Sequence, residues 1–307
     1  MAGDTHSAGY DDLFEPVVEL PDERVAARYE RLVGLDDIKA DLIRESVAVL
    51  NPDLFVRWAR EFHGSGFVGL EALIERLPMF IFAGDVGTGK TALAESFGSS
   101  LATSLEIPIR VFKLSLSARG RGLVGEMTAL ISTAFNRIIR EAHGGRNADG
   151  TARAASVLIV DEADALSQSR ESGEMHHEDR AGVNALIRGI DNLASKRLPV
   201  LVILCTNRGD AIDPAVVRRA ARIFQFGRPT HQQRMQLLEE FLRGVDLPEG
   251  AVARLSEAMA GGACSHTYSD IVQRIIPGAI LAVAPEEALT EEALLEAISK
   301  HPPSSPF

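Results

Sequence analysis

The sequence predicts an α/β fold, with a parallel sheet sandwiched by helices, followed by a small all-helical domain. Three features of the chain predict it. Apolar runs typical of buried strands alternate with stretches of helical apolar spacing up to about residue 227. A glycine-rich loop lies between one of these runs and the helix that follows it. From Pro229 the spacing is helical to about Ser299, which indicates a separate helical domain.

The elements follow one another in a regular order. Residues 1–24 are acidic, contain Gly and Pro and show no periodicity, so we expect a flexible arm there. Helical spacing then dominates residues 25–58. Five strands are expected, over residues 78–83, 108–114, 157–161, 199–205 and 222–226. The large α/β domain is therefore placed at residues 25–227 and the small helical domain at residues 228–307.

Composition narrows the class of protein. The net charge of −11 provides no diffuse basic field for DNA, RNA or anionic lipid, so neither nucleic acid nor membrane is expected as a partner. The two cysteines, Cys205 and Cys264, lie far apart and are expected to be reduced thiols. No apolar run approaches the ~18 residues that span a membrane, and the N-terminus lacks a signal pattern. These features predict a cytoplasmic protein.

The glycine-rich loop, Gly84-Asp85-Val86-Gly87-Thr88-Gly89-Lys90-Thr91, matches the phosphate-binding pattern G-x-x-x-x-G-K-[ST]. Its glycines let successive N–H groups point at phosphate oxygens, and the following helix adds the positive end of its dipole. We expect Lys90 to contact the β- and γ-phosphates and Thr91 to hold Mg²⁺. The predicted nucleotide contacts of this segment are Asp85, Val86, Gly87, Thr88, Gly89, Lys90, Thr91 and Ala92.

Two acidic residues, Asp161 and Glu162, follow the apolar run Val157–Val160 of the strand predicted over residues 157–161. Asp161 is expected to hold the Mg²⁺ water shell, and Glu162 to polarise the attacking water. Asp-Glu after a strand is also a good helix start, but its occurrence together with the phosphate loop favours the catalytic interpretation. Residues 161–164 also spell Asp-Glu-Ala-Asp, the box of a large helicase class. Those helicases need a second α/β domain, for which the helical residues after 227 leave no room.

Further along the chain, polar residues follow a fourth buried run. Asn207 ends it, and its amide is expected to hydrogen-bond the γ-phosphate or the attacking water, although capping the next turn is an alternative. Arg219 and Arg222 are three residues apart on a predicted helix and would share a face. Two guanidiniums on one face would reach a neighbouring subunit's γ-phosphate; a solvated basic surface is the alternative. An arginine supplied in that way contributes roughly 10³ to 10⁵ in rate.

With these motifs in this order, the span from Leu32 to about Ala284 resembles an AAA+ ATPase of the AAA branch. Val33 and Gly34 resemble the segment that lines the adenine pocket, and residues 206–222 resemble the second homology region of that branch. The resemblance implies that Asn207 is sensor 1 and that Arg219 and Arg222 act in trans. It also implies ATP and Mg²⁺ as cofactors and a ring, usually a homo-hexamer.

The resemblance extends to a pore loop and to the small domain. Rings of this kind commonly thread a polypeptide through a central pore, and Leu123-Val124-Gly125-Glu126 lines up with the family's aromatic–apolar–Gly–Glu stretch. Leu123 and Val124 are thus implied as substrate contacts, with leucine in the aromatic position; a plain surface loop is the alternative. Ser269-Asp270-Ile271 resembles the segment that packs beside the nucleotide, and Arg274 is implied as a sensor 2 arginine or, alternatively, a surface charge.

A narrower resemblance involves residues 178–191, which are similar to the pachytene-checkpoint remodellers, in their bacterial form. Those ATPases unfold the N-terminus of HORMA-domain proteins, and a bacterial member would separate a HORMA protein from its nucleotidyltransferase in cyclic-oligonucleotide anti-phage signalling. The expected function is therefore ATP-driven remodelling of a protein. A helicase loader or clamp-loader subunit is the alternative, favoured by Arg119 and Arg121 and opposed by the acidic net charge. A slowly hydrolysing, ATP-switched scaffold is a third.

Overall fold

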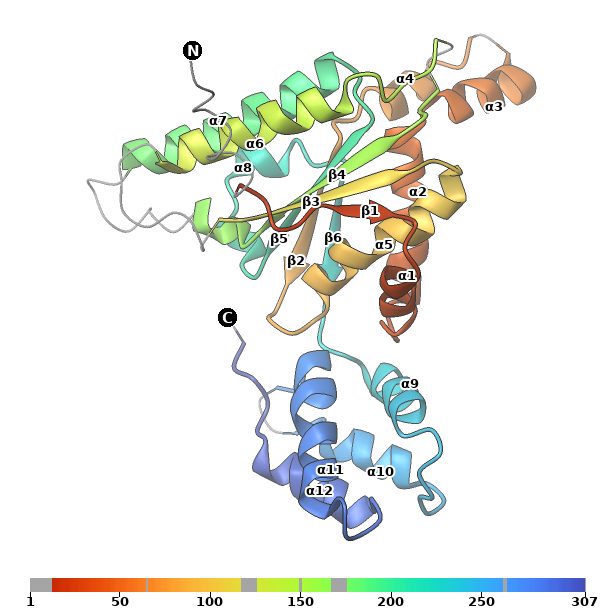
Figure 1. The fold of residues 1–307 in the computed structure, drawn as a ribbon, viewed down its shortest axis with the longest axis vertical. Coiled ribbons are helices and arrows are strands. Elements are labelled where there is room, and N and C mark those ends of the chain that lie inside the picture. The colour runs from red at the N-terminus through yellow and green to blue at the C-terminus, as the bar shows by residue number, and fades with distance from the viewer. Residues whose placement is uncertain are drawn as a thin grey trace, which may run out of the picture.

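A computed structural model of the protein describes residues 13–64, 66–116, 126–148, 151–166, 176–261 and 264–306, without the side chains of 176–179. A helix-covered sheet makes up one part of the molecule, and a cluster of short helices lies beside one end of it (Figure 1). Within the described residues, no helix is both long and apolar enough to cross a membrane.

A six-stranded sheet forms the centre, in the order β1-β3-β4-β5-β2-β6. The strands are β1 (Val18–Leu20), β2 (Met79–Gly84), β3 (Ile109–Ser115), β4 (Ala155–Asp161), β5 (Val200–Thr206) and β6 (Arg222–Phe226). The last five pair in parallel, and their bounds lie within two residues of the predicted strands. The predicted α/β class is confirmed, but the sheet is mixed because β1 runs antiparallel to β3.

The N-terminal segment differs from the flexible arm expected over residues 1–24. From residue 13 onward it is packed: Leu13, Phe14 and Leu20 are buried, and the Phe14 ring meets that of Phe112 edge-on at 5.4 Å. Asp22 caps helix α1 (Glu23–Glu30) by accepting hydrogen bonds from the next turn. A strand of three residues is too short for its periodicity to be recognised. Residues 1–12 lie outside the described part of the chain.

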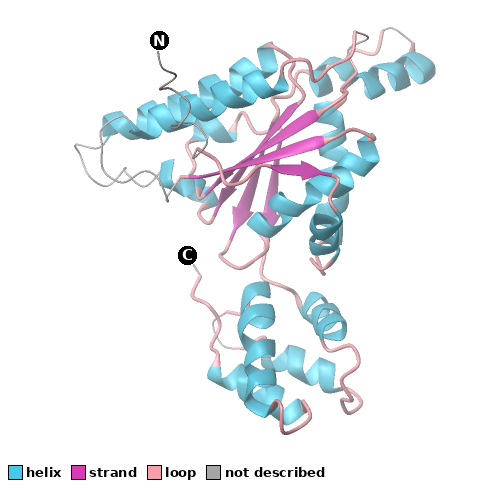
Figure 2. Cartoon of the chain, viewed as in Figure 1, coloured by secondary structure: helices cyan, strands magenta, loops and turns pink. Residues whose placement is uncertain are grey.

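Helices cover both faces of the sheet (Figure 2). The alternation along β2 shows how: Phe80 and Phe82 pack with α1, α2 (Asp36–Leu50) and α5 (Lys90–Leu105), whereas Met79 and Ile81 pack with α6 (Glu126–Ala142) and α7 (His176–Ser195). Helices α3 (Asp53–His63) and α4 (Gly69–Ile74) lie at the end of the sheet away from the helical cluster (Figure 1). The short helix α8 (Pro214–Val217) leads into β6.

The helical cluster has a core of its own. It comprises α9 (His231–Phe241), α10 (Ala251–Ala258), α11 (Ile276–Val283) and α12 (Glu291–Lys300), packed around Leu238, Leu255, Ile271 and Leu294. Residues 270–275 form a π-helical turn that runs into α11. After α12 the chain returns towards the sheet, so that the C-terminal segment, residues 301–306, lies on the side of the cluster nearest the sheet (Figure 1).

Candidate nucleotide-binding site

A cleft of about 540 Å³ lies where the carboxyl ends of the strands meet the helical cluster. Its walls come from α1 and the α1–α2 connection, the loop after β2, the ends of β4 and β5, and residues of the helical cluster. Ligands of open parallel sheets bind at this end of the strands. The residues predicted from sequence that line the cleft are Val33, Val86, Gly87, Gly89, Lys90, Thr91, Ala92, Asp161, Glu162 and Asn207.

The glycine-rich loop has the backbone shape that phosphate binding requires. Gly87 and Gly89 adopt φ of +76° and +95°, and α5 begins at Lys90 with Gly89 as its N-cap. The Lys90 side chain is tucked under the loop, 6 % exposed, and its Nζ donates to the carbonyl oxygens of Gly84 (2.8 Å) and Asp85 (2.7 Å). Burial lowers the pKa of Lys90. The loop is thus an anion cradle with a positive charge beneath it.

Three predicted residues, two from the glycine-rich loop and one from the α1–α2 connection, are not among the residues that line the cleft. Thr88 is fully buried and its Oγ1 donates to the Asp85 carbonyl at 2.7 Å, so it shapes the loop. The Asp85 carboxylate turns away towards Arg228. Gly34 contributes its carbonyl, which accepts hydrogen bonds from Gln233 (2.7 Å) and Tyr268 (3.3 Å) and so joins the α1–α2 connection to the helical cluster.

Thr91 and Asp161 lie together beneath the loop. The Thr91 Oγ1 donates to Asp161 Oδ1 at 3.2 Å, which brings the first turn of α5 to the tip of β4. Burial raises the pKa of Asp161. Lys113 of β3 lies nearby, with its Nζ 3.8 Å from Asp161 Oδ2. A hydroxyl and a carboxylate with room for phosphate oxygens and water beside them are the ligands that Mg²⁺ prefers, so this pair fits that ion.

Glu162 and Asn207 enter the cleft from neighbouring strands. Glu162 has a φ of +55°, a left-handed conformation uncommon for a residue with a Cβ and frequent at functional sites. Its Oε2 accepts a hydrogen bond from Ser115 Oγ at 3.1 Å. Sequence reasoning missed Ser115, whose only signal is its place at the end of β3, in register with Asp161 of β4. The backbone N–H of Asn207 donates to Asp164 at 3.4 Å.

Comparison with known proteins agrees with this geometry. A family model described as the ATPase family associated with various cellular activities (AAA) matches residues 80–228. The chain is 45% identical over 300 residues to CD-NTase-associated protein 6 of Escherichia coli strain MS 115-1, covering 97% of this chain and 96% of the relative. The chain belongs to the AAA ATPase family. The predictions of an AAA-branch ATPase and of ATP binding are therefore confirmed.

Two solved structures resemble this AAA ATPase over nearly its whole length. The structure of the HORMA:CdnC:Trip13 complex of E. coli MS115-1 matches with a TM-score of 0.88 and 43% identity, covering 96% of this chain and 97% of that one. The structure of Rhizobiales Trip13 matches with a TM-score of 0.76 and 36% identity, covering 95% and 100%. These matches confirm the narrower resemblance that the sequence carries at residues 178–191.

The arginines of this AAA ATPase depart from the sequence prediction. Arg219 and Arg222 do not share a helix face, because α8 ends at Val217 and Arg222 is the first residue of β6. The Ala221 N–H donates to the Met79 carbonyl at 2.8 Å, which pulls the chain out of helical geometry and into the sheet.

The side chains of Arg219 and Arg222 pair with carboxylates of their own chain. Arg219 Nε lies 3.2 Å from Asp191 Oδ1, and Arg222 Nη2 lies 3.3 Å from Asp41 Oδ2. The described residues that line the AAA cleft include neither arginine.

One further predicted nucleotide contact of the AAA resemblance, Arg274, does not belong to the described lining of the cleft. Arg274 lies on the π-helical turn, where its guanidinium pairs with Asp270 at 3.4 Å and is 57 % exposed. Val272 and Gln273 of the same turn line the cleft, whereas Arg274 does not belong to the described lining. Leu123 and Val124 fall outside the residues that the structure describes.

Proposed function

We propose that this chain is a Mg²⁺-dependent AAA ATPase that assembles into a hexameric ring, grips a polypeptide in its pore and remodels a HORMA-domain protein. By unfolding the N-terminus of that protein, it would separate it from a nucleotidyltransferase of anti-phage signalling. One observation carries the proposal: the chain matches the Trip13 fold of a HORMA:CdnC:Trip13 complex across 96% of its length at 43% identity. Action in the cytoplasm follows from those proposed partners.

Within each subunit, the roles follow from the cleft. Lys90, whose Nζ lies beneath the phosphate loop, binds the β- and γ-phosphates. Thr91 and Asp161 hold Mg²⁺, which when bound neutralises phosphate charge. Glu162 orients and deprotonates the attacking water, and Asn207 contacts the γ-phosphate from the end of β5. Val33 and Gly34 border the base.

Between subunits, Arg219 and Arg222 complete the neighbour's site. Neither residue belongs to the described lining of its own cleft, which supports this assignment, since a role in hydrolysis then requires a second copy of the chain. Both guanidiniums pair with carboxylates of their own chain, those of Asp191 and Asp41. Leu123 and Val124 are proposed to contact the substrate in the pore.

The proposal is tested with a trapped ring. Glu162→Gln is expected to bind ATP without turning it over, so that substrate stays engaged. The tagged variant is incubated with ATP and Mg²⁺ in lysate of the native host, and the retained proteins are identified by mass spectrometry. Lys90→Ala, which removes the ammonium under the phosphate loop, is the matched control that cannot load ATP.

Retention of a HORMA-domain protein by Glu162→Gln and not by Lys90→Ala supports the proposal. Purified HORMA protein in complex with its nucleotidyltransferase is then expected to dissociate when wild-type protein and ATP are added, as followed by size-exclusion chromatography. Retention of replication proteins or nucleic acid instead, with ATP turnover that falls steeply as salt rises, would overturn it in favour of a helicase or clamp loader.

A further inference from the structure

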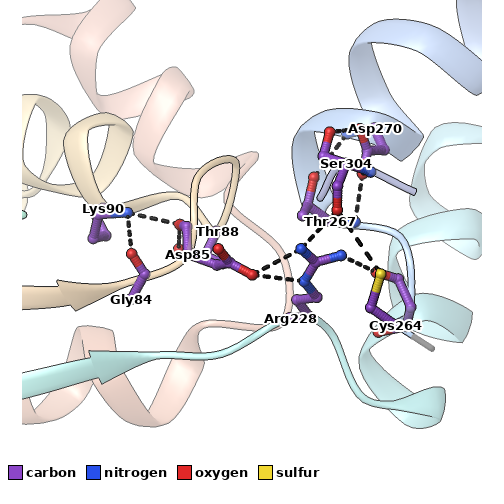
Figure 3. Close-up of polar contacts among 10 residues, drawn as sticks. Gly84, Asp85, Thr88, Lys90, Arg228, Cys264, Thr267, Asp270 and Ser304 are labelled. Atoms are coloured by element: carbon purple, nitrogen blue, oxygen red, sulfur yellow. Dashed lines mark hydrogen bonds and ion pairs between the residues drawn. The ribbon is translucent and has the colours of Figure 1, made fainter. Parts of the chain in front are cut away.

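One arginine joins the phosphate loop to the helical cluster. Arg228 follows β6, at the point where the chain leaves the sheet, and it lies against the second residue of the loop, Asp85 (Figure 3). Its Nε and Nη2 both contact Asp85 Oδ2, at 2.9 and 2.7 Å. The Arg228 and Asp85 side chains are 12 % and 18 % exposed, so the pair is largely screened from solvent.

Asp85 connects this ion pair to the phosphate-binding lysine. Its backbone carbonyl accepts hydrogen bonds from Lys90 Nζ and from Thr88 Oγ1, both at 2.7 Å (Figure 3). The carboxylate and the carbonyl of one residue are therefore held from opposite sides. Because both groups belong to one residue, the placement of the Asp85 side chain also affects the carbonyl to which Lys90 donates.

The remaining donors of Arg228 reach the helical cluster. Nη1 donates to the Ser265 carbonyl at 2.6 Å, and Nη2 donates to the Ser304 carbonyl at 2.7 Å. Ser265 precedes the π-helical turn, and Ser304 belongs to the C-terminal segment. One guanidinium thus joins three segments that are far apart in the sequence, and its planar fork suits simultaneous contacts of this kind better than an ammonium does.

The C-terminal segment is itself anchored firmly. Asp270, buried at 2 % exposure, accepts hydrogen bonds from the Ser304 hydroxyl at 2.6 Å, the Ser304 N–H at 3.1 Å and the Thr267 N–H at 2.9 Å. Burial opposes ionisation of Asp270, but these hydrogen bonds outweigh it and lower its pKa to about 2. Ser304 is therefore fixed to the helical cluster, and Arg228 fixes it in turn to the phosphate loop.

A second contact joins the same two parts. The Ser269 N–H donates to the Gly87 carbonyl at 3.1 Å. A Cβ on Gly87 would lie 2.6 Å from Thr267 Oγ1, which is closer than any side chain tolerates. The phosphate loop is consequently joined to residues 265–270 twice, through Arg228 at Asp85 and directly at Gly87.

We propose that Arg228 is a positioning residue for ATP binding, which fixes Asp85, and through its carbonyl Lys90, to the helical cluster and the C-terminal segment. Loading of the phosphate loop is thereby coupled to the placement of residues 265–270 and 301–306 through a single guanidinium. The inference rests on ATP binding by this AAA domain and does not depend on which protein the ring remodels.

The Arg228–Asp85 pair predicts that losing the arginine alone weakens ATP binding more than losing both partners does. Arg228→Ala leaves the Asp85 carboxylate without its arginine, a few residues from where phosphate binds, and the two negative charges repel. We expect the KM for ATP to rise about tenfold with kcat changed by less than about threefold, and Arg228→Lys to recover part of the loss. Asp85→Ala/Arg228→Ala removes the carboxylate as well and is expected to bind ATP more tightly than Arg228→Ala alone.

These variants are compared by steady-state ATPase kinetics and by equilibrium binding of a fluorescent ATP analogue. Arg243→Ala is the matched control, because Arg243 is an exposed arginine of the helical cluster that pairs with Glu240, three residues before it. An unchanged KM in Arg228→Ala, or a double variant that binds ATP worse than Arg228→Ala, would overturn the proposal.

Amide hydrogen exchange provides a readout that a merely structural ion pair would not move. In the wild-type protein, adding the ATP analogue is expected to change the protection of residues 265–270 and of the two amides that the proline-rich C-terminal segment carries at Ser304 and Ser305, the first of which is bound to Asp270. In Arg228→Ala at saturating analogue, that response is expected to be lost while the phosphate loop is still protected. A response of the C-terminal segment equal to that of the wild type would contradict the coupling.

Discussion

The nucleotide cleft and the arginine surface, formed by Arg219 and Arg222, differ in how their charged groups are held. Lys90 is buried and bound by backbone carbonyls of its own loop. The side chains of Arg219 and Arg222 are 23 % and 48 % exposed and pair with carboxylates on other elements. The cleft is assembled by the folding of one chain, whereas the arginine surface presents its charges outward.

This difference indicates which charged side chains can exchange their present partners for a phosphate. An exposed ion pair contributes little free energy, typically about 0–1 kcal/mol, so an arginine can leave it for a phosphate at low cost. A buried group cannot do so without a replacement partner. We therefore expect the cleft to determine whether ATP binds, and the arginine surface to determine whether bound ATP is hydrolysed.

Among the variants that test this difference, Arg219→Ala is expected to have the largest effect on ATP turnover. Loss of an arginine acting on the neighbour's γ-phosphate should lower kcat by about 10³-fold with little change in ATP affinity. The adjacent Arg218→Ala is the control. Because the arginine acts in trans, mixing Arg219→Ala with Glu162→Gln should restore part of the turnover that each lacks, since some sites then combine an intact base with an intact arginine.

The mixing experiment can also contradict the role of Arg219 in a neighbouring site. If the mixed sample is no more active than the average of its components, Arg219 does not complete a neighbouring site. An Arg219→Ala variant that fails to bind ATP would place the arginine in its own subunit's cleft, against the described lining.

The next largest effect is expected from Glu162→Gln. The amide has the size of the carboxylate but cannot accept the proton of the attacking water, so kcat should fall by about 10²- to 10³-fold. The ATP dissociation constant should change by less than about threefold, because the phosphate contacts remain. Single-turnover kinetics and nucleotide binding measure the two separately. Glu296→Gln, an exposed glutamate on α12 paired with Lys300, is the control.

A smaller effect, about fivefold, is expected from Ser115→Ala. The Ser115 hydroxyl donates to the Glu162 carboxylate and so occupies an oxygen that could otherwise accept the proton of the attacking water. Removing the hydroxyl should raise basal ATP turnover. A fall in turnover would show instead that Ser115 orients the base. Ser104→Ala, which removes an exposed hydroxyl from α5, serves as control in the same ATPase assay.

The smallest effect is expected from Asp191→Asn, which weakens the exposed pair with Arg219. The unfolding free energy, measured by urea titration, should change by less than about 1 kcal/mol. The kcat should change by less than about twofold. A larger loss of stability would mean that the arginine surface is structurally fixed like the cleft. Asp191→Glu, which keeps the charge, separates charge from side-chain length.

The sequence predicts the parts of this protein whose residues are contiguous. The phosphate loop and the acidic end of β4 are short patterns that carry their own geometry, and five strands were recognisable as buried apolar runs. ATP binding and the α/β class could be read from these. Arg219 and Arg222 could not be placed, because their spacing fits a helix, whereas pairing with β2, which starts with the hydrogen bond from Ala221 to Met79, takes the chain into β6.

Other contacts of the site could not be predicted from the sequence, because they join residues that are distant along the chain. Ser115 meets Glu162 across 47 positions, and Arg228 meets Asp85 across 143. A serine or an arginine carries no local sign of such a partner. The π-helical turn likewise cannot be recognised from spacing, and it turns Arg274 away from the cleft that Val272 and Gln273 line.

Strand β1 has a consequence for handling the protein. Its pairing with Ile109–Val111 covers the side of β3 that β4 leaves open. Without it, unpaired backbone groups beside an apolar surface would form a template for β-pairing between molecules. A chain shortened to begin at Glu23 would therefore be prone to aggregate while its ATP cleft stayed intact. We therefore expect solubility, rather than catalysis, to determine how far the N-terminus of the domain can be shortened.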